Sequence, residues 1–229
     1  MEHDQTAAVP GGEEPEYPLD RRFRAAAVLA GGASERMAGR DKQFLDVGGE
    51  PLAFRILRRL SAVFRDLAVV TNRPEGYRDF PGSLSVFPDL LPGFGPLSGL
   101  HAALSRSTSP WLYLVACDTP EFDPRWPSIL ARIIVLEEDS GRRPLAAVAA
   151  YGRHMEPFHG FYSRDLVPYI EQRISGGVSP ERRESIASVL AGLPHIRIPE
   201  ARVRELFPDW GLFRNINTPD DWNSYMLED

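Results

Sequence analysis

Cysteine is almost missing from this chain, since Cys117 is the only one among 229 residues. A single thiol excludes an internal disulfide framework and a zinc site built from several cysteines. The five histidines show no H-E-x-x-H or other paired ligand spacing, so we assign none of them to a metal. We expect Cys117 to be a small buried residue at the end of a strand.

Long apolar runs and an excess of basic charge are missing too. No segment approaches the roughly 20 apolar residues that span a bilayer, and no apolar signal-peptide region follows the N-terminus. We therefore expect a cytoplasmic protein with no membrane partner. The net charge is −6 and the basic residues are scattered. The sequence therefore lacks the clustered positive charge that is typical of proteins that bind nucleic acid. We expect neither DNA nor RNA as a partner.

The first 22 residues combine proline, glycine and acidic residues without hydrophobic periodicity. Such a composition cannot bury enough apolar surface to offset the entropy of ordering. We therefore expect residues 1–22 to form a flexible N-terminal tail and residues 23–229 to form one domain.

Short apolar runs alternate with helical periodicity from Phe23 onward, which is typical of an α/β protein with a mostly parallel central sheet and helices on both faces. The predicted strands are 25–29, 67–71, 84–87, 111–116, 145–150, 158–162, 195–198 and 212–216; the predicted helices are 52–64, 97–104, 129–136, 166–174 and 180–190, with a last helix capped by Thr218. Ligands of open α/β sheets bind beyond the carboxyl ends of the strands. The residues that follow the predicted strands should therefore lie along one rim.

Paired glycines follow the first predicted strand, in the stretch LAGGASERMAGRDK. Gly31 and Gly32 carry no Cβ and can bring backbone N–H groups close to an anion, and Arg36 and Lys42 add positive charge. The spacing matches neither the dinucleotide fingerprint nor the P-loop. We interpret the stretch as a loop that holds phosphates; the alternative is an ordinary strand-to-helix turn with surface charges.

A carboxylate directly follows the apolar run WLYLVAC, at Asp118. It needs a cation, a hydrogen-bond donor or water at that position. Mg²⁺ would meet this need, because it takes one or two carboxylates together with phosphate oxygens and water. The alternative is a helix N-cap or an Asx turn before Pro120.

Four further polar residues are candidates for contacts with a ligand. Asn72 offers both a donor and an acceptor to a base or ribose, and Asp89 lies in a Pro/Gly-rich loop that opens a helix near Pro96. A loop-forming asparagine and a structural turn explain the same residues. Arg182 and Arg183 either face a second anionic substrate or belong to a solvated helix face.

Taken together, these segments resemble the molybdenum cofactor guanylyltransferase family, which attaches GMP to molybdopterin. The motifs are LAGG with A-S-E-R-M and D-K at 29–42, T-N-R at 71–73, P-D and G-P-L-S-G-L within 88–100, C-D-T-P at 117–120 and N-I-N-T-P at 215–219. The resemblance covers the chain from residue 23 onward and implies a Rossmann-like nucleotidyltransferase fold. Two departures stand out: Ala38 replaces the usual glycine, and Gln43 with G-G-E-P-L is similar to cytidylyltransferases of isoprenoid synthesis.

The resemblance also implies roles for individual residues. By the resemblance, GTP is contacted by Leu29, Ala30, Gly31 and Lys42, and its guanosine part lies at Asn72 and Asp89. Asp118 would bind Mg²⁺. Asn215 and Asn217 would face the pterin. The substrates would be GTP and molybdopterin or Mo-molybdopterin. Cofactor-insertion or molybdoenzyme chaperone proteins would be further partners.

The expected reaction is the Mg²⁺-dependent transfer of GMP from GTP to the terminal phosphate of molybdopterin, with release of pyrophosphate. Arg36, Lys42 and Asp118 are the expected catalytic groups. An ionised acceptor phosphate needs no general base, which agrees with the lack of a catalytic His or Cys constellation. One alternative is a related nucleotidyltransferase that uses CTP or a sugar or alcohol phosphate acceptor. Another is a non-catalytic nucleotide-binding partner in cofactor delivery.

Overall fold

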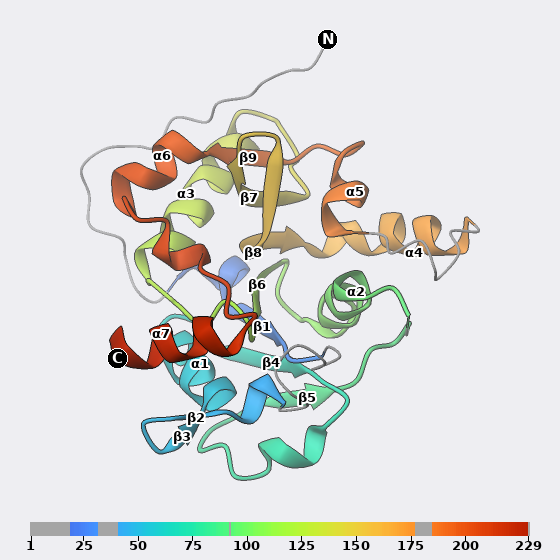
Figure 1. Cartoon of the computed structure of the whole chain (residues 1–229). Helices are drawn as coiled ribbons and strands as arrows, with labels where there is room; N and C mark the ends of the chain where they lie inside the picture. The colour runs from blue at the N-terminus through green and yellow to red at the C-terminus, as the bar shows by residue number, and fades with distance from the viewer. Residues whose placement is uncertain (1–18, 32–40, 92, 177–184, 229) are drawn as a thin grey trace.

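The computed structural model describes residues 19–31, 41–91, 93–176 and 185–228. Its centre is a seven-stranded sheet with the order β5-β4-β1-β6-β8-β7-β9 (Figure 1). The strands are β1 (Ala25–Leu29), β4 (Asp66–Val70), β5 (Ser85–Phe87), β6 (Trp111–Ala116), β7 (Ala146–Tyr151), β8 (His154–Ser163) and β9 (Ile196–Pro199). Strand β8 runs antiparallel to β6 and β7, and the other pairings of this sheet are parallel. The predicted mostly parallel α/β sheet is confirmed.

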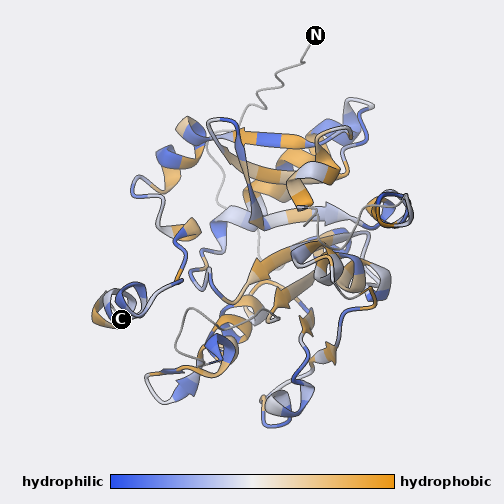
Figure 2. Cartoon of the chain, turned by 45° about the vertical axis from the view of Figure 1, so that its right-hand side comes forward, coloured by the Kyte–Doolittle hydropathy of each residue, from blue (hydrophilic) through white to orange (hydrophobic). Residues whose placement is uncertain are grey.

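Helices cover both faces of the sheet, as predicted. The helices are α1 (Leu52–Ser61), α2 (Pro96–Arg106), α3 (Arg125–Asp139), α4 (Val167–Ser175), α5 (Ile186–Leu190), α6 (Glu200–Leu206) and α7 (Pro219–Glu228). Side chains of α1, α3, α6 and α7 join one buried cluster, and those of α2, α4 and α5 join a second. Figure 2 shows the apolar colour concentrated on the central strands, between these helical layers.

The two central strands are apolar throughout. Strand β1 reads AAAVL and β6 reads WLYLVA, and every residue of both is buried. A strand that is covered on both faces reads as a continuous apolar run rather than as an alternation. Alternate residues of β1 enter opposite clusters, with Val28 in the first and Leu29 in the second. The carboxyl end of β1 is therefore held between two helical layers.

The described chain begins just before β1. Arg21–Phe23 forms a 3-10 turn (η1), Leu19 packs against the first cluster, and Arg22 pairs with Glu138 at 2.7 Å. Residues 19–22 thus contact the folded body. The expected tail covers residues 1–22; of these, residues 1–18 lie outside the described ranges, and the boundary after residue 22 stays a prediction.

One predicted strand is wrong. Residues 212–216 do not join the sheet, because Gly211–Phe213 forms a 3-10 turn (η6) and the next residues are irregular. The segment is a loop whose apolar side chains are buried in the first cluster; these are Leu212, Phe213 and Ile216. Their burial explains why the segment is apolar although it is not a strand. The backbone N–H of Ile216 bonds to the carbonyl of Asp118 instead of to a strand.

Two elements were not predicted. The hairpin of β2 (Asp46–Val47) and β3 (Glu50–Pro51) is too short to show periodicity, and it turns at Gly48 and Gly49, whose φ angles are +62° and +92°. Helix α6 is the other omission. None of the helices in the described ranges combines the length and the apolar character that crossing a bilayer requires.

Candidate active site

The carboxyl ends of β1, β4, β5 and β6 meet at one rim of the sheet. Leu29 is in register with both Val70 and Ala116, and Val70 is in register with Phe87. The residues that follow these strands therefore lie side by side, as the rule for open α/β sheets predicts. Two backbone bonds hold the loop starts together: Ala30 N donates to Val70 O at 2.9 Å, and Cys117 N donates to Leu29 O at 3.1 Å.

The loop that leaves β1 is only partly described. Gly31 is exposed, and a Cβ at this position would meet nothing within 4 Å. The backbone of Gly31 is thus open to a ligand on the side where a Cβ would lie. No neighbouring described atom would clash with a larger side chain at this position. Gly32 and Arg36 lie outside the described residues, so their assignment to phosphate stays a prediction.

Lys42 reaches across the rim to a segment far away in the chain. It opens a 3-10 turn, η3 (Lys42–Phe44), and its Nζ donates to the carbonyl of Ile216 at 2.6 Å and to Oδ1 of Asn217 at 3.1 Å. Asn217 was expected to face the pterin, and in the structure its side chain accepts from Lys42. Neither of the groups that hold Lys42 is a carboxylate, so its positive charge is not neutralised by these contacts.

Asp118 follows β6 on the same rim. Its carbonyl accepts a hydrogen bond from Ile216 N at 2.7 Å, so Lys42 and Asp118 are both tied to one residue. Its carboxylate Oδ1 is buried and has no hydrogen-bond partner among the residues that the structure describes. Burial raises the pKa of Asp118, and the positive charge of Lys42 acts in the opposite direction.

The carboxylate of Asp118 is the candidate cation ligand of the rim. Among the residues that the structure describes, no three His, Cys, Asp or Glu side chains gather as a metal cluster. A lone buried carboxylate oxygen without a donor nevertheless fits Mg²⁺, which takes one or two carboxylates and completes its shell with phosphate oxygens and water. The donor chemistry is therefore compatible with a cation that arrives with a triphosphate.

The remaining predicted residues lie at two places on the rim. Asn72 is exposed directly beyond β4, and Asp89 is half-buried beyond β5, where burial raises its pKa. Asn215 is exposed next to Ile216. Arg182 and Arg183 lie outside the described residues.

A buried polar network beneath the rim was missed from the sequence. The amide of Gln43 accepts from Thr71 Oγ1 at 3.0 Å and from Tyr77 OH at 2.8 Å, and it donates to the carboxylate of Asp41 at 2.9 Å. Asp41 in turn pairs with Arg73 at 3.2 Å. This network joins the Lys42 turn to the end of β4. A polar residue between Lys42 and Phe44 was the only signal in the sequence, and it does not reveal burial.

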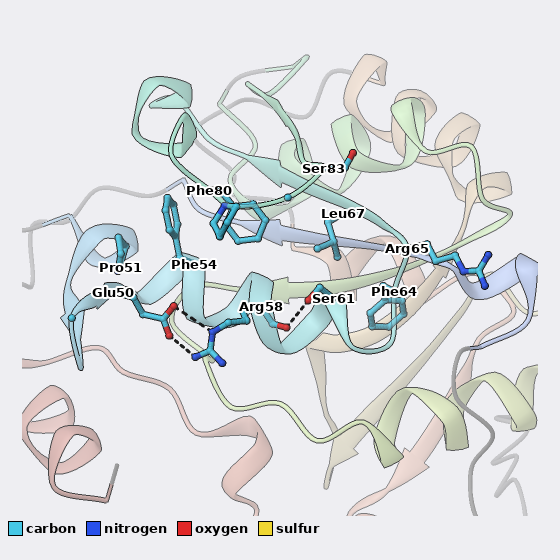
Figure 3. A pocket seen from close by; sticks show the side chains of 13 residues that line it. Glu50, Pro51, Phe54, Arg58, Ser61, Phe64, Arg65, Leu67, Phe80 and Ser83 are labelled. Carbon is cyan, nitrogen blue, oxygen red and sulfur yellow. Dashed lines mark hydrogen bonds and ion pairs between the residues drawn. The ribbon is translucent and has the colours of Figure 1, made fainter.

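A hollow of about 640 Å³ lies away from this rim, beside α1 (Figure 3). Phe54, Phe80 and Leu67 form its apolar wall, and the ion pair of Arg58 with Glu50 lies at its edge. Among the predicted site residues that the structure describes, none lines it. The hollow is therefore separate from the rim that carries Lys42 and Asp118.

Comparison with known proteins first defines the class. Residues 26–189 match the family model described as the MobA-like NTP transferase domain. A crystal structure of molybdopterin-guanine dinucleotide biosynthesis protein A from Archaeoglobus fulgidus has the same fold, with a TM-score of 0.71 at 23% identity, over 89% of this chain and 97% of that one. The protein is a nucleotidyltransferase.

Sequence relatives then define the family. The chain is 36% identical to the molybdenum cofactor guanylyltransferase of Syntrophotalea carbinolica, over 90% of this chain and 92% of the relative. It is 32% identical to the "Probable molybdenum cofactor guanylyltransferase" of Peptoclostridium acidaminophilum, over 89% and 88%. The chain belongs to the molybdenum cofactor guanylyltransferase family, and the resemblance seen in the motifs is confirmed.

Proposed function

We propose that this protein transfers GMP from GTP to the terminal phosphate of molybdopterin or Mo-molybdopterin, with release of pyrophosphate. The family supplies the donor and the acceptor. The observation that carries the proposal is the convergence of Lys42 and Asp118 on Ile216, which accepts from Lys42 Nζ at 2.6 Å and donates to Asp118 O at 2.7 Å. A cationic side chain and a carboxylate with one buried oxygen that finds no partner in the described part of the chain thus lie at the same rim.

The reaction breaks one bond at the α-phosphorus of GTP and forms another. An oxygen of the acceptor phosphate attacks this phosphorus, and the bond to the oxygen that bridges the α- and β-phosphates breaks. Its electron pair leaves with pyrophosphate. A phosphate monoester is largely ionised near neutral pH, so the attack needs no general base.

The titratable groups near the rim agree with a mechanism that uses no side-chain nucleophile. Cys117 is buried, and burial raises the pKa of its thiol, so the thiol stays protonated and shielded. The work left to the protein is positioning and charge stabilisation. Lys42 would exchange its contacts with Ile216 and Asn217 for phosphate oxygens, and the open backbone at Gly31 would receive the phosphates.

Asp118 would hold Mg²⁺ against the triphosphate. The cation supplies neutralisation of phosphate charge and a fixed orientation of the phosphate oxygens. Asn72 and Asp89 would lie at the guanosine, and Asn215 on the acceptor side. The roles of Gly32 and Arg36 at the phosphates, and the transfer of the product to insertion or chaperone proteins, are predictions that the described residues do not test.

A turnover assay with separate nucleotides tests the proposal. The protein is incubated with Mg²⁺, molybdopterin and either GTP or CTP, and both pyrophosphate and the dinucleotide product are measured. We expect GMP incorporation that requires both Mg²⁺ and molybdopterin.

Each other outcome points to a different function. Incorporation of CMP without GMP would replace the proposal with a cytidylyltransferase. Turnover with a sugar or alcohol phosphate but not with molybdopterin would move the protein to another acceptor class. Binding of GTP without pyrophosphate release from any acceptor would contradict an enzymatic role.

A further inference from the structure

A fully buried imidazole lies behind the turn that carries Asp118, and the proposed reaction leaves it without a role. His159 in β8 has no exposed surface, and its ring makes two hydrogen bonds. Nε2 lies 3.0 Å from the carbonyl oxygen of Thr119, the residue next to Asp118. Nδ1 lies 3.1 Å from the hydroxyl of Tyr113 in β6.

These partners fix the tautomer of the ring. A carbonyl oxygen only accepts, so Nε2 carries the proton and donates it to Thr119 O. Nδ1 is then the acceptor, and the hydroxyl of Tyr113 donates to it. Complete burial lowers the pKa of His159 to about 4, against the effect of the bond to Thr119, so the ring is neutral near pH 7.

The backbone of β8 is distorted at this residue. His159 has a φ of +55°, a left-handed conformation that costs a non-glycine residue on the order of 1–2 kcal/mol. The register between β7 and β8 shifts beside it, since Ala147 pairs with Phe161 whereas Ala149 pairs with Glu156. Bulges of this kind redirect a side chain and are common next to active sites. The indole N–H of Trp126 donates to the carbonyl of His159 at 2.6 Å and holds the distortion in place.

The turn itself is bound at several atoms. Thr119 donates from both its N–H and its Oγ1 to the carbonyl of Ala116 at 3.1 Å, and Asp118 O accepts from Ile216 N at 2.7 Å. The bond from His159 supplies the remaining restraint, at the carbonyl of Thr119. Backbone strain that is retained at one residue is a reason to look for a role of its side chain. Of the two hydrogen bonds that the ring makes, the one to Thr119 reaches the turn that carries Asp118.

We propose that His159 is a positioning residue: its Nε2–H fixes the carbonyl of Thr119 and thereby aims the carboxylate of Asp118 at the cation site. This inference rests on the proposed function, because it assigns the cation to Asp118. The imidazole touches neither substrate nor cation. It acts through the backbone of the turn.

Two substitutions separate this role from simple stability. The amide nitrogen of a glutamine can occupy the place of Nε2, so His159→Gln keeps the donor to Thr119. Asparagine tolerates the left-handed backbone but ends near the place of Nδ1, so His159→Asn loses that donor. Trp111→Phe is the stability control, because Trp111 is buried at the opposite end of β6 and donates to Glu138.

The readout is binding of Mn²⁺ as a probe for the cation, measured by electron paramagnetic resonance in the presence of GTP. Loss of a partner that orients a metal ligand typically weakens metal binding by about 10- to 100-fold. We expect a weakening in this range for His159→Asn, and a change below about threefold for His159→Gln and Trp111→Phe. GTP affinity in EDTA should stay within about twofold for all three variants, because the bond lies outside the nucleotide contacts.

The possible failures are distinguishable. If His159→Asn lowers the melting temperature as Trp111→Phe does but binds Mn²⁺ like the wild type, His159 has only a structural role and the inference is overturned. Equal weakening in the Gln and Asn variants would overturn the role of Nε2–H. A wild-type protein that binds no Mn²⁺ with GTP would overturn the cation site of the proposed function, and this inference with it.

Discussion

Asp118 has a buried carboxylate oxygen that receives no hydrogen bond from any described residue, and its carbonyl is held in place by Ile216. A group that binds a cation and orients phosphates acts mainly in the transition state. We therefore expect Asp118→Ala to lower kcat by about 10²- to 10³-fold, the range seen when one charge-stabilising group is removed. GTP affinity, measured by calorimetry, should change by less than about fivefold. The exposed Asp220 in α7 supplies the control Asp220→Ala. An Asp118→Ala enzyme with wild-type kcat would contradict the assignment.

Lys42 should behave differently, because a positive charge attracts the phosphates of bound GTP as well as the charge that develops during transfer. Its Nζ is held by a carbonyl and an amide oxygen, contacts that a phosphate can replace. We expect Lys42→Ala to weaken GTP binding and to lower kcat, each by about tenfold or more. Unchanged GTP affinity in a titration would rule out the phosphate contact.

Gln43 is a buried amide whose hydrogen bonds join the Lys42 turn to Thr71 and Tyr77. Its Oε1 accepts from Tyr77 OH, and both side chains are buried. Gln43→Leu leaves the hydroxyl of Tyr77 without an acceptor, which costs about 1–3 kcal/mol. We expect urea unfolding to show this loss, and Tyr77→Phe added to Gln43→Leu to recover part of it. A double variant whose two losses simply add would show that the two groups are not coupled.

At the scale of elements, the start of α7 sets the position of the segment that holds Lys42. Thr218 Oγ1 accepts from Asp221 N at 3.1 Å, and Asp221 accepts from the N–H groups of Asn217 and Thr218. Thr218→Ala removes the cap and should lower the free energy of unfolding by about 1 kcal/mol. Ser224→Ala on the exposed surface of α7 is the control and should change stability by less than about 0.5 kcal/mol. Equal effects of the two substitutions would show that the cap does not stabilise the helix.

The elements also show what can be read from a sequence. Strands β1 and β6 were predicted because both are covered on two faces and read as unbroken apolar runs. The segment 212–216 carries three apolar side chains, all of them buried, yet its backbone bonds to the Asp118 turn. Periodicity reports that side chains are buried and does not report which partner the backbone finds.

The sequence predicted those site residues that come directly after strands, because the carboxyl ends of parallel strands meet at one rim. Asp118 was assigned from a carboxylate next to an apolar run and Lys42 from a positive charge in the stretch that follows the paired glycines, and the structure brings them to one rim. The contact of Lys42 with Asn217 and the networks around Gln43 and His159 were not predictable. They depend on side chains that are distant in sequence and that become neighbours only when α1, β8 and the segment before α7 have packed.

At the scale of the whole molecule, His159 couples stability to pH. Its pKa is about 4 in the folded protein and about 6.5 ordinarily, so between these values the unfolded chain binds more protons. Stability should therefore fall as the pH is lowered from about 6.5 to about 4, by up to about 3 kcal/mol from this residue. The raised pKa values of the half-buried Asp89 and Glu156 carboxyls act in the opposite direction.

Urea unfolding of the wild type and of His159→Gln, at about pH 7 and about pH 4.5, isolates the histidine from these carboxyls. The wild type should lose more stability than the variant on acidification. Identical losses in the two proteins would show that His159 keeps its ordinary pKa in the folded state.

The bond between Lys42 and Ile216 joins residues that are 174 positions apart. Ribosomes deliver the chain from its N-terminus, so a nascent polypeptide presents the glycine-containing loop and the whole of β6 well before Ile216 and Asn217 emerge. Throughout that interval Lys42 and the Asp118 carbonyl lack the partner that ties them together. The contacts that tie Lys42 to the Asp118 turn therefore form late in biosynthesis, and stalled or prematurely terminated chains that lack this segment would be released without them.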